Sequence, residues 1–429
     1  MSRWWPWLLL VLALTPAVLI RPARVPPPKP VAGAVTVALL SNPVTVDPAK
    51  ASTPAEWAVA DNVFQPLYRF NASGRLVPDL ASSAQFTGHR VILHLAHRNL
   101  SNGQPVTAAM VAGSLARALE PSVHSLAALQ LLKPVRGYAA VVAGTKSGLS
   151  GVTATSSSTL TLTLRKPAGP WFLRNLANPA LAIVPPADPL RGGPDWQLTN
   201  LYGSGGYRLH AWNPSDYLSF ERTGSTTGPE KVELVVYPSF HEALMSFVNQ
   251  SLDIVPVAPE QLAGLPMDVR RRVLTLPVPG TLSLYLNPKA KSGIAAYPAT
   301  GIRRWVSAAF SGHLQAVSSA AWPAGVPQGK PMTLAVNQSN GEAVLLAETL
   351  RGLEHGRVTV QMMTSTALMQ AVRGGQVNAY LGIVDGYAGG GIQVPLAPMA
   401  TFWLVGPTVA GARVYADGSL NWHSLTPRP

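Results

Sequence analysis

The sequence predicts an α/β protein built from two or three domains. Its 429 residues are enough to bury large cores. Hydrophobic residues make up 47% of the chain and charged residues 12%, a balance typical of compact globular proteins. From Val232 to Gly390, short apolar strand patterns alternate with amphipathic helix patterns. Together these observations favour sheets covered by helices.

The first thirty residues form an export segment. Arg3 precedes an uncharged apolar run from Leu8 to Ile20, whose length lies between a signal-peptide core and a minimal membrane span. The basic, proline-rich stretch from Arg21 to Pro30 is an extended spacer. Both an uncleaved signal anchor and a cleaved signal peptide fit this pattern, and cleavage after the small residues that end at Ala34 would make Val35 the first mature residue.

The composition excludes several kinds of site and partner. With no cysteine, the chain has no disulfide, no thiolate metal ligand and no lipid-modified cysteine. The formal net charge of +13 is not concentrated in a basic run, so nucleic-acid binding is not predicted. Attraction to an acidic cell wall or to anionic lipid, or service in an acidic medium, is the explanation that such a charge favours.

The elements near the N-terminus have clear local signals. Residues from Ala34 to Leu40 read as a strand, and residues from Glu56 to Val63 as a helix. That helix should end there because Pro66 restricts the residue before it. Residues from Asn71 to Gly74 form a turn in which glycine is free to adopt positive φ.

Similar signals mark the middle of the chain. Thr107 precedes apolar residues at helical spacing and is a natural N-cap. Residues from Val91 to Leu95 and from Thr159 to Leu164 alternate like half-buried strands. Later strands are predicted at Leu218–Arg222, Val232–Tyr237, Leu282–Asn287, Met332–Val336 and Val358–Met362, helices at Phe240–Val248, Glu342–Leu353 and Thr366–Val372, a helix start at Ile302–Val306, and core anchors at Phe402 and Trp403.

The order of short motifs in the first lobe identifies a family resemblance. An acidic Asp-Pro step is followed by a helix ending in Pro-Leu, a turn with glycine, a Pro-Asp-Leu-Ala element, a hairpin and a helix start with the pattern G-x-P-x-T-A-x-x-V. The matching segments are Val46–Pro48, Gln65–Leu67, Asn71–Gly74, Pro78–Ala81 and Gly103–Val111. In this the chain resembles the extracytoplasmic solute-binding proteins of ABC importers, family 5, the peptide, dipeptide and nickel-binding type.

The resemblance implies a two-lobe, periplasmic-binding-protein-like fold of type II, with a hinge between the lobes and an accessory subdomain in the first lobe. It implies capture of a solute, a short peptide, for delivery to an ABC permease by a monomeric protein. The alternative is a membrane-tethered, degenerate binding domain that acts in sensing or partner binding. The implied divisions are 1–30 for the export segment, 31–278 for the first lobe with its accessory subdomain at about 52–150, 279–394 for a short second lobe, and 395–429 for a segment that returns to the first lobe.

No arrangement of residues predicts catalysis, a cofactor or a metal site. His94 and His97 lie on a strand pattern, where residues three apart point to opposite faces. The spacing of a nucleophile elbow around Ser204 fails because Tyr202 occupies the position that needs glycine. Carboxylates are sparse and form no local pair. The sequence therefore predicts a binding protein and no enzyme.

The predicted ligand contacts come mainly from the resemblance. Peptide-binding relatives use an aspartate after a G-W-x-x-D pattern to pair with the α-amino group of the ligand, and Asp385 lies at about this place. The spacing here is one residue short and Ile383 replaces the tryptophan, so a plain turn residue before Gly386 is the alternative. Weaker candidates, placed by their positions at strand ends, are Asn42, Tyr285, Asn287 and Tyr387.

Overall fold

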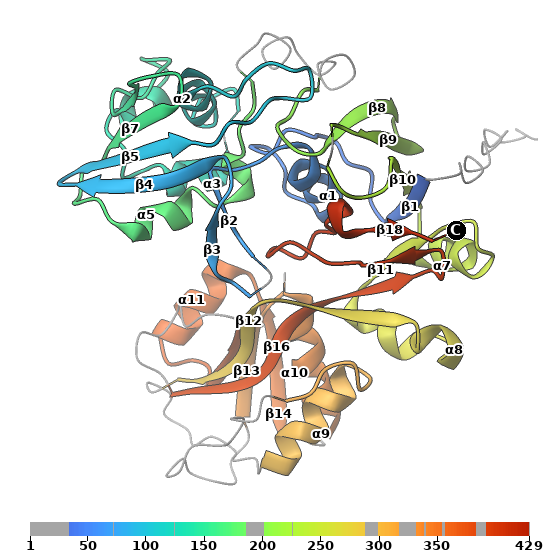
Figure 1. Ribbon diagram of the computed structural model, residues 1–429. Helices are drawn as coiled ribbons and strands as arrows, with labels where there is room; N and C mark the ends of the chain where they lie inside the picture. Colours follow the sequence, from blue (N-terminus) through green and yellow to red (C-terminus); the bar gives the residue numbers. More distant parts are fainter. Residues whose placement is uncertain are drawn as a thin grey trace, which may run out of the picture.

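The structure is a computed structural model, and it shows three bodies around one long sheet (Figure 1). Lobe I, the accessory subdomain and lobe II are distinct in the ribbon, and two long strands connect lobe I to lobe II. Within the described residues, no helix is both long and apolar enough to cross a membrane. The structure describes residues 34–71, 73–123, 125–185, 201–224, 226–287, 299–316, 332–338, 340–353, 357–382 and 392–428.

The central sheet has ten strands and runs through both lobes in the order β14-β13-β15-β12-β16-β11-β1-β10-β9-β8. β12 and β16, each of 14 residues, pair antiparallel along almost their whole length. Their register shifts between Pro277 and Thr281, where a bulge interrupts the ladder. The bounds are β1 Ala34–Leu39, β8 Tyr207–Asn213, β9 Tyr217–Arg222, β10 Lys231–Val236, β11 Ile254–Val257, β12 Val273–Leu286, β13 Met332–Asn337, β14 Val358–Met363, β15 Ala379–Gly382 and β16 Ile392–Val405.

Lobe I is organised around β1, which pairs in parallel with β10 on one side and β11 on the other. Asp253 fixes this arrangement: its Oδ2 accepts hydrogen bonds of 2.8 Å from both the backbone and the hydroxyl of Thr36. The C-terminal segment then packs back on lobe I through the buried Trp422. The remaining elements here are α1 Pro54–Val63, α7 Phe240–Val248, η3 Pro259–Gly264, α8 Met267–Arg270, β17 Val409–Ala410, η4 Trp422–Ser424 and β18 Thr426–Pro427.

The accessory subdomain has its own sheet, in the order β4-β5-β7-β6, and its own hydrophobic core. Thr107 caps its main helix by accepting a hydrogen bond of 3.2 Å from the backbone of Met110. Its elements are β2 Tyr68–Phe70, β3 Leu76–Pro78, β4 Ala81–Thr87, β5 Arg90–Leu95, α2 Ala108–Arg117, α3 Leu126–Leu131, α4 Tyr138–Val142, β6 Val152–Ala154, β7 Thr159–Thr163, α5 Pro170–Asn175 and η1 Pro179–Leu181.

In the described part of lobe II, α9 Ala299–Ala309 and α10 Gly341–Leu353 cover one face of the β14-β13-β15 end of the central sheet, and α11 Ser365–Arg373 covers the other. Trp305 is buried and its indole donates a hydrogen bond of 2.6 Å to the carbonyl of Leu346, which ties α9 to α10. On the other face of the sheet, the rings of Tyr285 and Tyr380 stack with centroids 4.8 Å apart.

Two turns contact the strands that join the lobes. The turn of the β2–β3 hairpin reaches β12, and a Cβ placed at Gly74 would lie 3.1 Å from Cβ of Pro279. The C-terminal turn reaches β16, because a Cβ at Gly418 would lie 2.7 Å from Cγ2 of Thr401. Both glycines have positive φ, 72° and 94°, which disfavours any other residue at these contacts. The accessory subdomain and the C-terminal segment therefore both contact the crossing strands.

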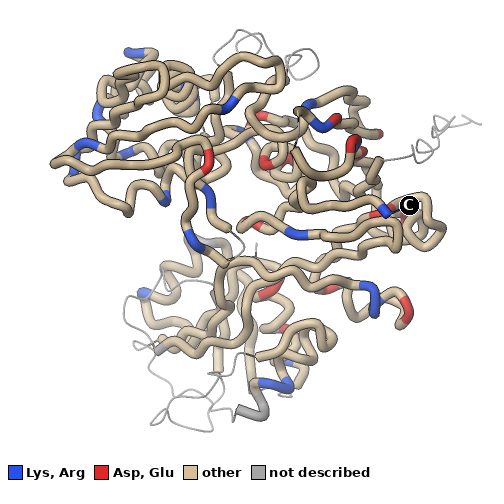
Figure 2. Tube along the Cα trace, viewed as in Figure 1, with Lys and Arg blue, Asp and Glu red and all other residues tan. Residues whose placement is uncertain are grey.

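The predictions of local structure are largely confirmed. The first helix ends at Val63 as expected, and Phe402 and Trp403 are buried, with exposed fractions of 2% and 9%. The strand predicted from Leu282 instead begins at Val273, because its first residues pair with the C-terminal part of β16. Figure 2 shows Lys and Arg spread over all three bodies, in agreement with the absence of a basic run.

Candidate functional site

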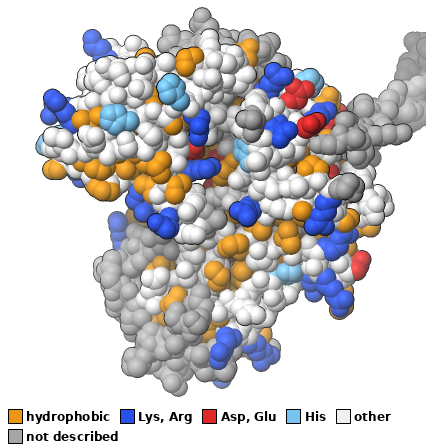
Figure 3. All heavy atoms as spheres, viewed as in Figure 1, with side chains coloured by type: hydrophobic (Ala, Val, Ile, Leu, Met, Phe, Trp, Pro, Cys, Tyr) orange, Lys and Arg blue, Asp and Glu red, His pale blue; other side chains and the backbone are white. Residues whose placement is uncertain are grey.

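A cavity of about 420 Å³ lies where lobe I, the accessory subdomain and the C-terminal segment meet. The space-filling view shows this face hollowed between the accessory subdomain and the rest of the molecule, and both basic and acidic side chains meet in the hollow (Figure 3). The lining residues are Asp61, Phe64, Gln65, Pro66, Arg69, Phe70, Asp79, Arg174, Ala177, Asn178, Pro179, Gly205, Tyr415, Ala416, Asp417, Asn421 and His423.

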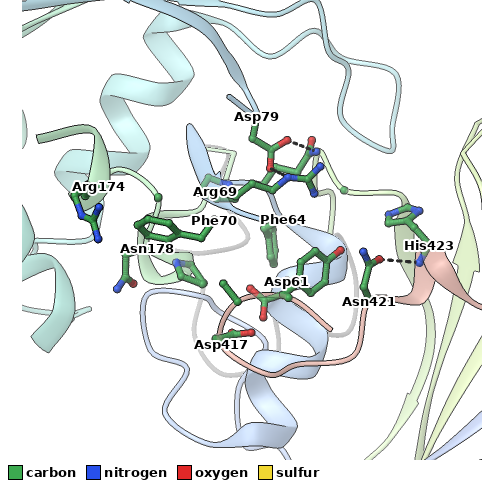
Figure 4. A pocket seen from close by; sticks show the side chains of 17 residues that line it. Asp61, Phe64, Arg69, Phe70, Asp79, Arg174, Asn178, Asp417, Asn421 and His423 are labelled. Atoms are coloured by element: carbon green, nitrogen blue, oxygen red, sulfur yellow. Dashed lines mark hydrogen bonds and ion pairs between the residues drawn. The ribbon is translucent and has the colours of Figure 1, made fainter. Parts of the chain in front are cut away.

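One wall carries a pair of carboxyl groups from distant parts of the chain. Asp61 comes from the last turn of α1 and Asp417 from the C-terminal turn, and their carboxyl groups lie side by side (Figure 4). The hydroxyl of Ser419 lies between them, 2.5 Å from Oδ2 of Asp61 and 2.9 Å from Oδ1 of Asp417. Burial raises the pKa of Asp61 well above its usual range, and the neighbouring charge of Asp417 raises it further.

The facing wall combines an acid with a base. Nε of Arg69 lies 3.8 Å from Oδ2 of Asp79, and the side-chain amide of Gln65 donates a hydrogen bond of 2.9 Å to Oδ1. Burial raises the pKa of Asp79 to about 6, although the nearby guanidinium groups of Arg69 and Arg98 oppose the shift. Arg69 is half-exposed, with 47% of its side chain accessible, so it retains donors that can reach a bound molecule.

A second guanidinium group stands at the edge of the cavity. Arg174 lies over the ring of Phe70, with its central carbon 5.2 Å from the ring centroid. Within the described ranges no carboxylate forms an ion pair with Arg174. Its five donors are therefore available for a carboxylate of a ligand.

Asn62 holds the two halves of the cavity together. Its side-chain amide donates hydrogen bonds of 2.9 Å to the carbonyls of Ala58 and Leu420, and its oxygen accepts one of 3.0 Å from the backbone of Trp422. α1 is thereby fixed to the C-terminal segment, and Asp61 is placed against the turn that carries Asp417. Figure 4 shows this turn and the end of α1 together beneath the cavity.

His423 closes the side of the cavity toward β8 Tyr207–Asn213. Its Nδ1 lies 3.1 Å from the carbonyl of Thr227, and its ring packs against Tyr207 with centroids 5.3 Å apart. Burial lowers the pKa of His423, which favours the neutral imidazole. The ring therefore adds a neutral wall to the cavity.

Of the predicted ligand contacts, the three that the structure describes do not line this cavity. Asn42 is exposed, and its amide oxygen accepts a hydrogen bond of 3.1 Å from the backbone of Ser215. Tyr285 and Asn287 are buried in lobe II, where the amide of Asn287 donates to two backbone carbonyls at 2.9 and 3.0 Å. Asp385 and Tyr387 lie outside the described residues. The roles of these five in binding remain predictions.

The cavity was missed because its members look unremarkable along the chain. Asp79 belongs to one of the recognised motifs, and Asp61 immediately precedes the recognised helix end, but neither position indicates a pocket. Asp417 lies in an Ala-Asp-Gly turn with no signal beyond that of a turn. Their proximity follows only from the return of the C-terminal segment to α1.

Known proteins share this architecture. An unliganded open form of MppA, a periplasmic murein tripeptide-binding protein, superposes with a TM-score of 0.70 at 18% identity, covering 92% of this chain and 97% of that one. OppA of Haemophilus influenzae, in complex with the peptide RPPGFSPFR, gives a TM-score of 0.59 at 16% identity, covering 92% and 99%. At these identities the likeness concerns the fold, which is the two-lobe α/β fold predicted from the sequence.

Sequence comparison gives the family. The periplasmic murein peptide-binding protein MppA of Escherichia coli is 32% identical over 172 residues, 39% of this chain and 32% of that protein. The glutathione-binding protein GsiB of Escherichia coli is 27% identical over 191 residues, 44% of this chain and 34% of that protein. The matches thus span about a third of the length of these curated relatives. A family profile matches residues 75–304, and the chain belongs to the bacterial extracellular solute-binding proteins, family 5.

Proposed function

We propose that this protein captures a short peptide outside the membrane and delivers it to the permease of an ABC importer. The observation that carries the proposal is a cavity between lobe I, the accessory subdomain and the C-terminal segment, in which the carboxyl groups of Asp61 and Asp417 face the guanidinium groups of Arg69 and Arg174. A peptide offers matching groups, because it carries both ammonium and carboxylate charges. The relatives named for murein peptide and glutathione support the same class of ligand.

Capture would proceed by closure of the two lobes. β12 and β16 are the strands that cross from lobe I to lobe II, and the bulge between Pro277 and Thr281 gives them a place to bend. A ligand that contacts both lobes binds the closed form better and shifts the population toward it. Closure of this kind needs no covalent step, so no catalytic residue and no cofactor is assigned.

A thermal-shift screen tests this proposal. The body from about residue 31 onward is heated with di- to pentapeptides, nickel chelates or oligosaccharides, and any ligand that binds only the folded state raises the midpoint. We expect a rise with peptides alone. A rise only with chelates or sugars would contradict the peptide assignment. No rise with any class, in well-folded protein, would favour the tethered domain that binds a partner without transport.

The predicted partner of the peptide α-amino group is Asp385, which the family resemblance places in lobe II. Replacement by asparagine (Asp385→Asn) should weaken peptide binding by about 1.5–3 kcal/mol, the range for a hydrogen bond to a charged group. Calorimetric titration of the best peptide from the screen measures the change. Asp268→Asn removes the same charge from the exposed helix α8 and serves as the control. Equal affinities of the two variants would remove Asp385 from the site.

The export segment can be tested in the same preparation. Residues 1–33 lie outside the described part of the chain. Intact mass of the protein from the membrane fraction should include Met1 or Ser2 if the segment is an anchor. A mature N-terminus at Val35 in the soluble fraction would instead show cleavage of a signal peptide.

A further inference from the structure

The pair formed by the half-buried Asp61 and the exposed Asp417 differs from the three buried acids of the described chain. Asp47 pairs with Arg117, and Glu233 lies 2.6 Å from Nζ of Lys231. The third buried acid, Glu56, accepts hydrogen bonds from three backbone amides at the start of α1. Each of these carboxylates has a cation or a set of backbone donors.

Asp61 and Asp417 have no such partner. In the described residues neither forms an ion pair, and the donors that reach them come from Ser419. Its hydroxyl reaches both carboxyl groups, and its backbone amide donates to Oδ1 of Asp417. One hydroxyl proton cannot serve two carboxylates. The two carboxyl groups therefore share a cavity wall without a cation from the described chain. Their repulsion raises the pKa of Asp61, and either a proton held by the pair or a bound cation would relieve it.

The surroundings of the pair fit an organic cation on a hydrocarbon stem. The rings of Phe64, Phe70 and Tyr415 line the same cavity and offer apolar surface to a stem and ring faces to a positive group. A metal ion would need more ligands, and no group of three potential metal-ligating side chains occurs among the described residues.

The charge of the cavity also opposes the charge of the molecule. Its lining holds three aspartates against two arginines, a formal charge of −1, whereas the whole chain carries +13. His423 adds no positive charge to the lining at neutral pH, because burial lowers its pKa. Because the pKa of Asp61 is raised, the full negative charge develops only when the pair loses its proton, and a bound cation would favour that loss.

We propose that the Asp61–Asp417 pair is a specificity subsite that receives the cationic side chain of a lysine- or arginine-type residue in the ligand. The inference rests on the proposed capture of peptides and adds a preference for basic ones. The apolar rings beside the pair suit a hydrocarbon stem, which a lysine or arginine side chain has and the α-amino group lacks. Both carboxylates would accept hydrogen bonds from the same ammonium or guanidinium group.

Matched tripeptides test the subsite. Alanine tripeptides with lysine at each position in turn are compared with the same peptides carrying norleucine, which keeps the stem and loses the charge. For at least one position we expect the wild-type protein to bind the lysine peptide about tenfold or more tightly, the effect of a charged hydrogen bond. The double replacement Asp61→Asn and Asp417→Asn should bring that ratio close to one, while Asp268→Asn leaves it unchanged.

The outcomes separate the subsite from the general function. Equal binding of lysine and norleucine peptides by the wild-type protein would overturn the subsite and leave peptide capture intact. A preference that survives the double replacement would place the cation elsewhere. Binding of no tripeptide would overturn the subsite, and it would overturn peptide capture as well if no di- to pentapeptide raises the thermal midpoint. Calcium chloride is also added to the complex with the lysine peptide. Displacement of the peptide by calcium would overturn the organic-cation subsite and indicate a metal site.

Discussion

Lobe I is attached to its two neighbours in different ways. Toward lobe II the apolar core is continuous, since one cluster extends from Ala38 and Val255 in lobe I to Leu334 and Leu346 in lobe II. Toward the accessory subdomain the core is interrupted, because that subdomain has a separate cluster of its own. The attachment there is polar and includes the ion pair between Asp47 and Arg117. The cavity lies at this second junction, where two cores meet without merging.

The difference shows where a binding protein can place polar groups. A continuous core transmits packing between the lobes and leaves no room for unpaired charge. An interrupted core leaves a seam that holds acidic groups such as Asp61 and Asp79, whose pKa values are raised by burial. Raised pKa values mark this seam, as they mark many functional sites.

The largest effect should come from breaking the apolar junction. Phe402 on β16 is buried in the shared core and stacks on Phe310 with ring centroids 6.0 Å apart. Phe402→Ala should lower the free energy of unfolding by about 3–5 kcal/mol, because it leaves a cavity between the lobes. Urea denaturation measures the loss, and Phe402→Leu should cost much less. A loss below about 1 kcal/mol for the alanine variant would mean that the two lobes do not depend on a common core.

Breaking the polar junction should lower the free energy of unfolding somewhat less than Phe402→Ala does, and the effect should be more local. Arg117→Ala leaves Asp47 as an unpaired buried carboxylate, and we expect a loss of about 3 kcal/mol. Hydrogen exchange should show most of the lost protection in the accessory subdomain. The exposed pair of Arg208 and Glu221 is the control, since Arg208→Ala should cost less than about 1 kcal/mol. Equal losses in the two variants would show that the Asp47 pair does not support the junction.

The smallest effect concerns how Asp79, at the junction between lobe I and the accessory subdomain, makes stability depend on pH. Asp79 has a pKa of about 6 in the folded protein and about 3.8 when unfolded, so its contribution to stability is present below about pH 4 and is lost as the pH rises through about 6. Above pH 6, Asp79→Asn should therefore be more stable than the wild type by about 2 kcal/mol. Urea midpoints at pH 4, 5, 6 and 7 measure the difference, with Asp268→Asn as the reference. Parallel curves for the wild type and Asp79→Asn would contradict the assigned shift.

Much of the fold could be read from local signals. Thr107 caps α2, Gly74 has the positive φ expected of its turn, and β7 Thr159–Thr163 shows the alternating burial that its pattern predicts. In each case the physical cause lies within a few residues, so the sequence contains it. The start of β12 was missed because its first residues pair with β16, which lies more than a hundred residues later.

The candidate site is less accessible to such reasoning. Position at a strand end is the only signal for Asn42, Tyr285 and Asn287, and the described structure places none of them at the cavity. Ser419 lies 358 positions from Asp61, and no periodic pattern connects the two. Partly buried acids of this kind cannot be told from surface acids until their surroundings are known.

By itself the sequence determined the family, the α/β class and the ends of most strands and helices, because caps, turns and alternating apolar residues act over short distances. The tertiary structure alone decided where the apolar core is continuous, where it is interrupted and which carboxylates meet without a counter-charge. Burial and electrostatic interaction depend on every atom nearby, whatever its place in the chain. The cavity between lobe I, the accessory subdomain and the C-terminal segment is therefore a property of the folded protein.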